Sequence, residues 1–208
     1  SWTIGSEGEH EVLFEQHNPD YIPRERGGPA VVIADSENNR IVEYQRTSTG
    51  EWNQSWIWQD RQMQWPRDAD RLPNGHTLIA DTGSNRIIEV NQSGDVVWQF
   101  AYPRSYEVER LNTGDESTGG QSAVEENLTS ASLNSVSEST NVRRTGNPIV
   151  SLYYSFKQIL PNKIVNGLIN ATPAVIGFSE ILLGVLLLLN LITWMTIEWY
   201  RSAFSLQL

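Results

Sequence analysis

Histidine and arginine are the residues through which this 208-residue chain could carry out group transfer, because it contains no cysteine. A neutral imidazole is a competent nucleophile, and a guanidinium matches the charge spread over the oxygens of an oxyanion. There are three histidines, His10, His17 and His76. Arg67 and Arg71 are four residues apart and would share one face of a β-strand. They could line a channel or pair with nearby carboxylates.

The acidic residues beside these arginines do not predict a metal site. The run from Asp68 to Gly75 (DADRLPNG) has some character of a Ca²⁺ loop, but it lacks a third oxygen ligand at the right spacing and the distal glutamate of an EF-hand. Zinc-type ligand spacing is absent from the sequence. We therefore predict no metal.

A repeated segment predicts the elements that must position the candidate residues. Residues 32–44 (VIADSENNRIVEY) return 46 positions later as residues 78–90 (LIADTGSNRIIEV). A repeat near this period is typical of a β-propeller, in which each unit packs only against its neighbours. An antiparallel sandwich or a loose hairpin array is the alternative, but the matched turn residues favour the propeller.

Short runs of β-branched and aromatic residues, joined by Gly and Asn turns, predict an all-β fold with about two complete four-stranded blades. The expected strands are 20–22, 29–34, 40–45 and 52–58 in the first blade, then 68–72, 76–80, 86–90 and 96–100 in the second. Arg40 and Arg86 begin equivalent third strands. We expect each of them to bond its own turn or the adjacent blade.

Both ends of this array suggest further blades. Residues 1–5 resemble the last strand of a preceding blade. A third unit starts with Tyr102-Pro103-Arg104, which echoes Trp65-Pro66-Arg67, and continues with residues 109–111, which echo residues 70–72. A propeller closes with roughly 4–8 blades. We therefore expect residues 1–111 to be part of a larger propeller, with the missing blades in an upstream segment or a partner chain.

Three runs within residues 1–111 resemble the arylsulfotransferase family, most closely its haloarchaeal, membrane-anchored branch. They are FEQHNPDYIP at 14–23, GGPA at 27–30 and WPRDADRLPNG at 65–75. The resemblance implies a six-bladed propeller that transfers a sulfuryl group from one phenol to another without a cofactor. It also implies that a histidine in the central channel carries the sulfuryl group while His and Arg side chains hold the sulfate oxygens.

His17 is the candidate catalytic residue that this resemblance implies, because it lies just before an innermost strand and could face the channel. The alternative is a loop histidine that bonds the Asn18-Pro19 turn. The two other histidines are expected to be solvated. The candidate substrate-binding residues are Arg67, Arg71 and Arg104.

The overall charge of the chain disfavours a polyanion-binding role. Residues 1–147 contain 23 acidic residues and 12 basic ones, all of them arginine. A surface this acidic repels nucleic acid, so we expect no nucleic-acid partner. It fits a soluble domain, or a salt-adapted, halophilic one.

The C-terminal half divides into a stalk and a membrane anchor. A flexible polar linker is expected because residues 112–147 are rich in Ser, Thr, Gly and Glu and lack aromatics. The 17 residues Ile181 to Ile197 carry no charge, which predicts a transmembrane helix over 173–200 that would anchor the chain in a lipid bilayer. Thr172-Pro173 would cap its start. An interfacial amphipathic helix is predicted at 148–170, and a short tail at 201–208.

Four Asn-x-Ser/Thr sequons favour a propeller on the outside of a single-pass cell-membrane protein. They lie at Asn53, Asn91, Asn127 and Asn170. Three functions remain open: a surface-anchored arylsulfotransferase-like enzyme acting on a phenolic sulfate, a non-catalytic propeller that binds protein or glycan, and a membrane-complex subunit that assembles through the helix bearing Glu180.

Overall fold

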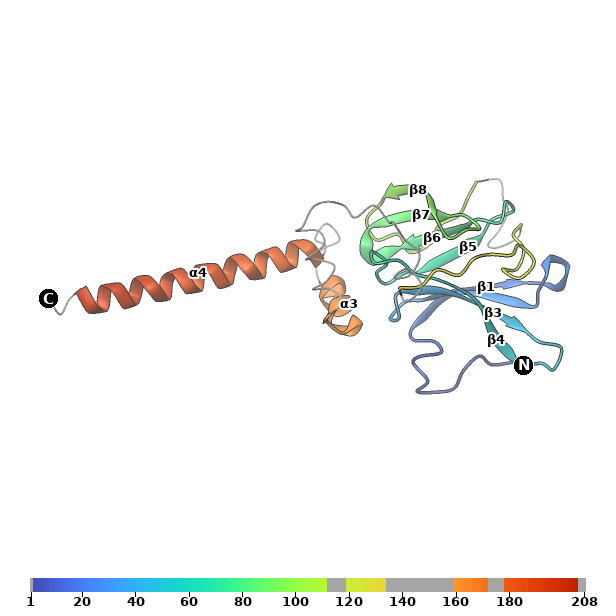
Figure 1. The fold of residues 1–208 in the computed structure, drawn as a ribbon, viewed down its shortest axis with the longest axis horizontal. Helices are drawn as coiled ribbons and strands as arrows, with labels where there is room; N and C mark the ends of the chain where they lie inside the picture. The colour runs from blue at the N-terminus through green and yellow to red at the C-terminus, as the bar shows by residue number, and fades with distance from the viewer. Residues whose placement is uncertain (1, 112–118, 134–158, 172–177, 206–208) are drawn as a thin grey trace.

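Two four-stranded antiparallel sheets make up the N-terminal half of the computed structural model, which describes residues 2–111, 119–133, 159–171 and 178–205 (Figure 1). Each sheet is a meander, in the orders β1-β2-β3-β4 and β5-β6-β7-β8. Sheet 1 contains β1 (Gln16–Ile22), β2 (Ala30–Asp35), β3 (Arg40–Arg46) and β4 (Trp52–Trp58). Sheet 2 contains β5 (Asp68–Arg71), β6 (Thr77–Asp81), β7 (Arg86–Val90) and β8 (Val96–Ala101).

The eight strands predicted from the sequence are confirmed, and the two sheets lie side by side as neighbouring blades of a propeller do. Aliphatic residues and two tryptophans fill the space between them; they are Ile22, Ala30, Val32, Ala34, Ile41, Trp56, Trp58, Met63, Ala69, Ile79, Ile88 and Val90. Because each sheet buries one face against the other, neither could keep its apolar face from water alone.

The repeated Asp and Arg of the duplicated segment form the same clamp in both sheets. The Arg40 Nε donates to an Asp35 carboxylate oxygen at 2.6 Å, and the Arg86 Nε donates to Asp81 at 2.6 Å. Each clamp joins the end of a second strand to the start of a third, across a turn whose asparagine has a positive φ. Each arginine was expected to bond its own turn or the adjacent blade, and both bond the aspartate at their own turn.

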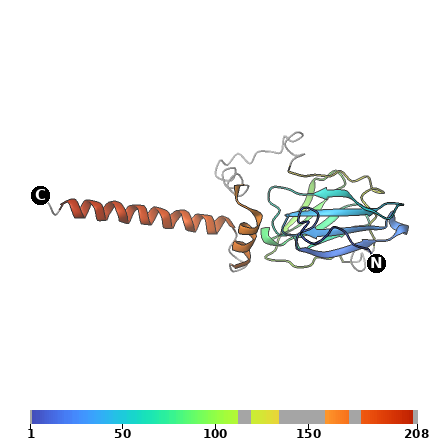
Figure 2. The same ribbon diagram turned by 90° about the horizontal axis from the view of Figure 1, so that it is seen from below.

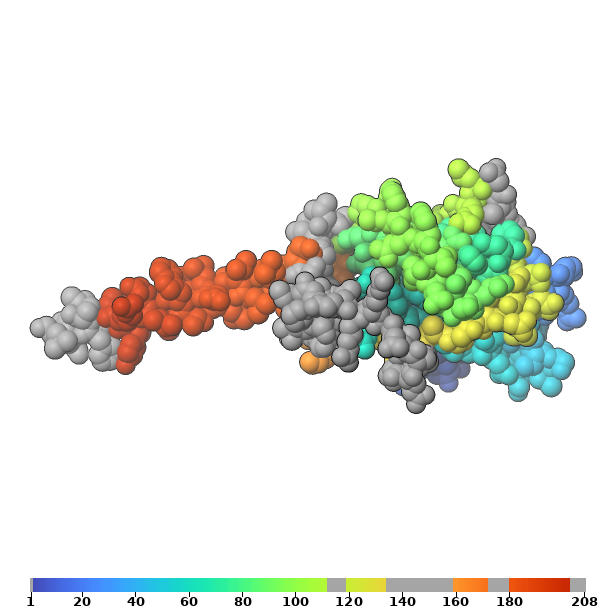
Figure 3. All heavy atoms as spheres, turned by 45° about the horizontal axis from the view of Figure 1, so that its top comes forward, coloured from blue at the N-terminus to red at the C-terminus, as the bar shows by residue number. Residues whose placement is uncertain are grey.

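Part of the expected flexible linker is packed against the sheets instead. Residues 119–133, here called the wedge segment, fill the groove between the outer edges of the two sheets and appear yellow in Figure 3. Ala131 forms a parallel bridge with Trp58, and the Thr129 N–H donates to Gln92 O at 2.8 Å. The segment fits closely, because a Cβ on Gly120 would lie 2.1 Å from Arg71 O. The rest of 112–147 lies outside the described residues.

The N-terminal segment is also different from the prediction, because no strand forms within residues 2–13. This segment covers the face of sheet 1 that points away from sheet 2. Ile4, Val12 and Leu13 pack there on an apolar cluster made of Val31, Ile33, Val42 and Tyr44. The ring centroids of Trp2 and Trp52 are 4.7 Å apart.

Two helices follow the sheets. Helix α3 (Asn162–Ala171) packs against loops of sheets 1 and 2, with Val165 and Ile169 buried. Val165 and Ile169 therefore contact protein, while Ile164 and Leu168 of the same helix are exposed. The interfacial helix predicted for residues 148–170 stays a prediction, and residues 148–158 lie outside the described part. The Asn166 Nδ2 donates to Glu37 Oε2 at 3.0 Å, which fixes α3 to sheet 1.

Helix α4 (Phe178–Ser205) projects away from the sheets in both ribbon views (Figures 1 and 2). Its segment Glu180–Ser202 is long and apolar enough to cross a membrane. The Thr193 and Thr196 hydroxyls donate to the carbonyls four residues earlier, at 2.8 and 2.7 Å, so neither needs water. The proposed Thr172-Pro173 cap and residues 206–208 of the tail lie outside the described residues.

Candidate functional site

A cluster at the inner edges of the two sheets brings His17, Arg67 and Tyr106 together. His17 is the second residue of β1, and Arg67 directly precedes β5. The Arg67 Nη1 contacts His17 Nε2. The ring of Tyr106 lies edge-on to His17, with centroids 6.1 Å apart, and 5.8 Å from the Arg67 guanidinium carbon.

These three side chains occupy equivalent positions in three successive units. In each unit the residue two positions earlier has a positive φ near 50°: Glu15, Trp65 and Arg104. Hydrogen bonds establish the correspondence. The Trp65 and Arg104 N–H groups donate to the side chains of Asn39 and Asn85, which are repeats of each other.

A second set of repeated hydrogen bonds gives the same alignment. The Ser36 hydroxyl donates to Pro66 O at 2.5 Å, and its repeat, Thr82, donates to Ser105 O at 2.6 Å. Ser105 therefore corresponds to Pro66, and Tyr106 to Arg67. The sequence match that we predicted between Arg104 and Arg67 is therefore wrong by two residues.

The hydrogen bonds of His17 decide which ring nitrogen carries the proton. Its Nδ1 lies 2.9 Å from Glu15 O and 3.0 Å from Ser36 Oγ. A carbonyl only accepts, and the single Ser36 hydroxyl proton is already donated to Pro66 O. Both partners of Nδ1 are therefore acceptors, so Nδ1 holds the proton and the lone pair is on Nε2. That lone pair points at Arg67.

Burial lowers the pKa of His17, and the positive charge of Arg67 lowers it further. The Glu15 carbonyl and carboxylate oppose this shift only in part. The imidazole is thus neutral at pH 7, the form in which Nε2 is nucleophilic. The alternative, a loop histidine that bonds the Asn18-Pro19 turn, does not hold, since the hydrogen-bond partners of His17 are Glu15, Ser36 and Arg67.

Two aromatic rings hold the Arg67 guanidinium. Its carbon lies 3.6 Å from the centroid of Trp65 and 5.8 Å from that of Tyr106. Burial lowers the pKa of Arg67, while Tyr106, Glu15 and Glu37 raise it; an arginine remains charged in any case. The cluster therefore combines a cation, a neutral imidazole whose Nε2 lone pair faces that cation, and flat apolar rings. This combination can hold an anion attached to an aromatic group.

Arg71 does not belong to this cluster. It is 1% exposed and lies between the sheets, where its Nη2 donates to Glu43 at 3.0 Å and its guanidinium stacks 4.7 Å from the Trp56 ring centroid. Burial lowers the pKa of Arg71 to about 10, against the pull of Glu43. The expectation that it binds substrate is corrected: this arginine is covered on all sides and joins one sheet to the next.

Arg104 is also placed differently from the sequence-based expectation. Its guanidinium donates to Ile169 O of α3, so it ties this helix to the sheets instead of joining His17. Of the two other histidines, His10 is exposed as expected and lies beside the Phe14 ring. His76 is not fully solvated, because its Nδ1 lies 2.6 Å from a Glu89 carboxylate oxygen.

The four sequons lie on different elements of the described structure. Asn53 is exposed on β4, and Asn170 is exposed near the end of α3. Asn91 opens the turn between β7 and β8, where its side-chain oxygen accepts from Ser93 N and Asp95 N. Asn127 is exposed in the wedge segment. Glycosylation at all four stays a prediction.

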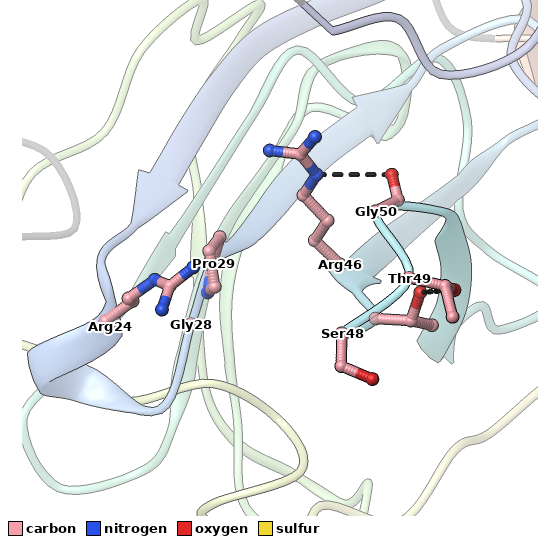
Figure 4. A pocket seen from close by; sticks show the side chains of 8 residues that line it. Arg24, Gly28, Pro29, Arg46, Ser48, Thr49 and Gly50 are labelled. Atoms are coloured by element: carbon pink, nitrogen blue, oxygen red, sulfur yellow. Dashed lines mark hydrogen bonds between the residues drawn. The ribbon is translucent and has the colours of Figure 1, made fainter.

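A cleft lies at the ends of the sheet 1 strands opposite to the His17 cluster. This cleft of about 510 Å³ is formed by the loop before β2 and the turn between β3 and β4 (Figure 4). Arg24 and Arg46 contribute the charge, and Thr47, Ser48 and Thr49 contribute hydroxyls. The Arg46 Nε donates to Gly50 O at 3.2 Å. In the described residues, no group of three or more His, Asp or Glu side chains is arranged to hold a metal.

Sequence reasoning missed Ser36, Trp65 and Tyr106 as members of the cluster. A signal for Tyr106 was present, because the match of residues 109–111 with 70–72 places Tyr106 opposite Arg67. No comparable signal singles out Ser36, since its role depends on a carbonyl 30 residues away.

Comparisons with known proteins assign no family to the chain. No protein-family model matches it, and no curated protein matches it. Among solved structures, a luciferin-regenerating enzyme is similar, with a TM-score of 0.37 and 10% sequence identity. The match covers 52% of this chain and 43% of that one, so the chain spans less than half of its length. That similarity identifies neither a family nor a function.

Proposed function

We propose that this chain is the membrane-anchored part of an arylsulfotransferase-like propeller at the cell surface, in which His17 accepts a sulfuryl group from a phenolic sulfate. The observation that carries the proposal is the fixed tautomer of His17. Both partners of Nδ1 are acceptors, which leaves the Nε2 lone pair directed at the Arg67 cation. The runs around His17 and Arg67 that resemble arylsulfotransferases support the same assignment.

The transfer would proceed in two balanced steps. The His17 Nε2 lone pair attacks the sulfur of an aryl sulfate, an N–S bond forms, the S–O bond to the ring breaks, and phenolate leaves. The proton on Nδ1 stays in place, hydrogen-bonded to Glu15 O and Ser36 Oγ, which stabilises the cationic ring. A second phenol then loses its proton to solvent, its oxygen attacks the sulfur, and the N–S bond breaks.

As the substrate enters, the Arg67 guanidinium would exchange its contact with His17 Nε2 for the sulfate oxygens while it stays over the Trp65 ring. The cation therefore already lies at the site before the charge develops. Tyr106, which is exposed, offers a ring against which the aryl group could stack. No step needs a metal or a nucleotide.

The rest of the chain supports attachment to a bilayer. Helix α4 would cross the membrane, and the sequons favour placing both sheets outside the cell. The remaining blades would come from an upstream segment or from a partner chain.

The test is turnover by the full chain in detergent or vesicles, with 4-nitrophenyl sulfate as donor and phenol as acceptor. We expect His17→Ala to abolish nitrophenolate release and Arg67→Ala to reduce kcat by roughly 10²-fold, as for loss of one oxyanion-binding group. The matched controls His10→Ala and Arg24→Ala should leave the rate unchanged. Full activity of His17→Ala would disprove the assignment.

A non-catalytic role in binding an acidic glycan or protein is the second candidate. It is favoured by the cleft with Arg24 and Arg46, because two cations and three hydroxyls line it in an otherwise acidic chain. A full chain that binds a sulfated glycan, loses this binding in Arg24→Ala/Arg46→Ala and shows no turnover would favour this role.

A further inference from the structure

The contact between the two sheets shows how the aromatic residues on the outermost strand of sheet 1 are buried by the next sheet. On sheet 1, Trp56 and Trp58 are each 2% exposed. They are covered by sheet 2 and the wedge segment: the Trp56 Nε1 donates to Thr129 O, and the Trp58 Nε1 donates to Gly94 O. Beside them the Glu43–Arg71 pair links sheet 1 to the innermost strand of sheet 2.

Sheet 2 has aromatic residues at the equivalent positions of its outermost strand. Trp98 lies opposite Glu89 as Trp56 lies opposite Glu43, and Phe100 lies opposite Ile87 as Trp58 lies opposite Ile41. The ion pair is repeated too, because Arg110 contacts Glu89. Trp98 and Phe100, however, are 47% and 52% exposed.

Only the inner part of this face is covered by described residues. Residues 104–110 run along it as the beginning of a third unit. The Ser105 carbonyl accepts from Thr82, the Val108 N–H donates to Asp68 at 2.8 Å, and Arg110 contacts Glu89. The outer part, with Trp98 and Phe100, remains open.

We propose that this open face of sheet 2, defined by Glu89, Trp98 and Phe100, is the docking surface for the outer strands of a third antiparallel sheet whose innermost segment is residues 104–110. The occupant is a polypeptide that presents an aliphatic sheet face. The reason is that sheet 2 covers Trp56 and Trp58 with such a face, made of Ala69, Ile79, Ile88 and Val90. The interface thus continues one already present in the molecule.

Strand β8 itself fits this role. Its six residues, Val96 to Ala101, are uncharged and all exposed, and the Trp98 and Phe100 rings stack with centroids 6.1 Å apart. An apolar edge strand of this kind is a surface for pairing with another chain. The equivalent edge of sheet 1 is closed, because β4 bonds to Ala131 of the wedge segment. The proposal does not depend on the chemistry of His17.

A second copy of the chain can serve as the probe once a sheet face is uncovered on it. Residues 4–13 cover Val31, Ile33, Val42 and Tyr44, an apolar face of sheet 1. The full-chain variant Ile4→Asp/Val12→Asp/Leu13→Asp should expose that face. In detergent it should then associate head-to-tail with the open face of another copy, as measured by analytical ultracentrifugation across concentrations.

Adding Trp98→Glu/Phe100→Glu to this variant should weaken the association at least tenfold. The matched control is Val96→Glu, which changes an exposed residue of β8 that pairs with Val90, on the face toward sheet 1, and should leave the association unchanged. Association that survives Trp98→Glu/Phe100→Glu, no association at all in a folded variant, or an equal effect of Val96→Glu would overturn the proposal.

If circular dichroism shows that the first variant is unfolded, a second variant tests the docking surface. A copy of residues 63–101 inserted after Ala101 in the full chain would supply a complete third sheet. Acrylamide quenching of Trp98, isolated by comparison with a Trp98→Phe version, should fall at least threefold relative to the parent. Unchanged quenching would contradict the docking surface, whatever the activity of His17.

Discussion

At the scale of single residues, His17 differs from the other two histidines in what its ring nitrogens face. His10 is exposed beside Phe14, and the His76 Nδ1 donates to a Glu89 carboxylate, whereas the Nε2 of His17 keeps a lone pair that faces a cation. The difference arises from backbone geometry. The positive φ of Glu15 turns its carbonyl toward the His17 ring, and Ser36 closes the other side.

The pKa of His17 gives a pH-dependence prediction. Because the folded-state pKa is lowered from 6.5, the unfolded chain binds a proton that the folded chain does not bind as pH falls below about 6.5. The stabilisation from this residue is therefore complete above pH 6.5 and is lost as pH falls through the folded-state pKa. Thermal unfolding from pH 7.5 to 5 should show a smaller loss of Tm in His17→Gln than in the parent chain.

Turnover should decline over the same range, because protonation of Nε2 removes the nucleophile. Nuclear magnetic resonance titration of the His17 ring measures its pKa in the folded chain directly. A His17 pKa above 6.5 in the folded chain would contradict the prediction.

The buried ion pair of Arg71 with Glu43 gives a prediction about the stability of the contact between the sheets. Removing one member of a buried ion pair leaves the other uncompensated, which costs about 3–5 kcal/mol. We expect Arg71→Leu and Glu43→Leu each to lower the free energy of unfolding by about that amount. In denaturant titrations of the double variant, the loss should be well below the sum of the two. Additive losses would show that the two side chains do not interact.

At the scale of elements, the strands were predictable, because alternating apolar residues and Gly or Asn turns are local signals. The wedge segment was not predictable. Its polar composition matches a linker, and its place depends on contacts far along the chain, such as the Ala123 N–H donating to Glu43 at 2.9 Å across 80 residues. Tyr106 was missed for a different reason: a two-residue error in aligning the third unit put Arg104 in its place, although the match of residues 109–111 with 70–72 gives the right alignment.

The two Asp–Arg clamps should differ in their contribution to stability. Asp81 is fully buried and Arg86 is almost so, while Arg40 is partly exposed and can be solvated when it loses its partner. Burial alone would lower the pKa of Arg86, but the carboxylates of Asp81 and Asp60 raise it above its usual value. We expect Asp81→Ala to lower the free energy of unfolding by about 3 kcal/mol and Asp35→Ala by a smaller amount, measured by urea unfolding. Equal losses would contradict this explanation.

At the scale of the whole molecule, helix α3 connects the sheets to the membrane helix. It is fixed to sheet 1 through Asn166 and contacts Arg104, and α4 begins only seven residues after α3 ends. A chain of that length spans at most about 25 Å, so an α4 that crosses a bilayer would hold the side of the sheets that carries His17 near the bilayer surface.

Membrane attachment is tested by fractionation. We expect the full chain to stay in the membrane pellet after an alkaline carbonate wash, because α4 carries exposed apolar side chains along its length. A chain ending at Ala171 should appear in the soluble fraction, with the near-ultraviolet circular dichroism of its tryptophans retained. Release of the full chain by carbonate would contradict a spanning helix.

The most direct test of the account is to look for the sulfuryl group on His17. The full chain in detergent is mixed with 4-nitrophenyl sulfate without an acceptor, quenched in alkali, and digested for tandem mass spectrometry. We predict one added sulfuryl group on the peptide containing His17, lost when phenol is added and absent from His17→Ala. Nitrophenolate release with no such group on His17, or with the group on another residue, would contradict the account.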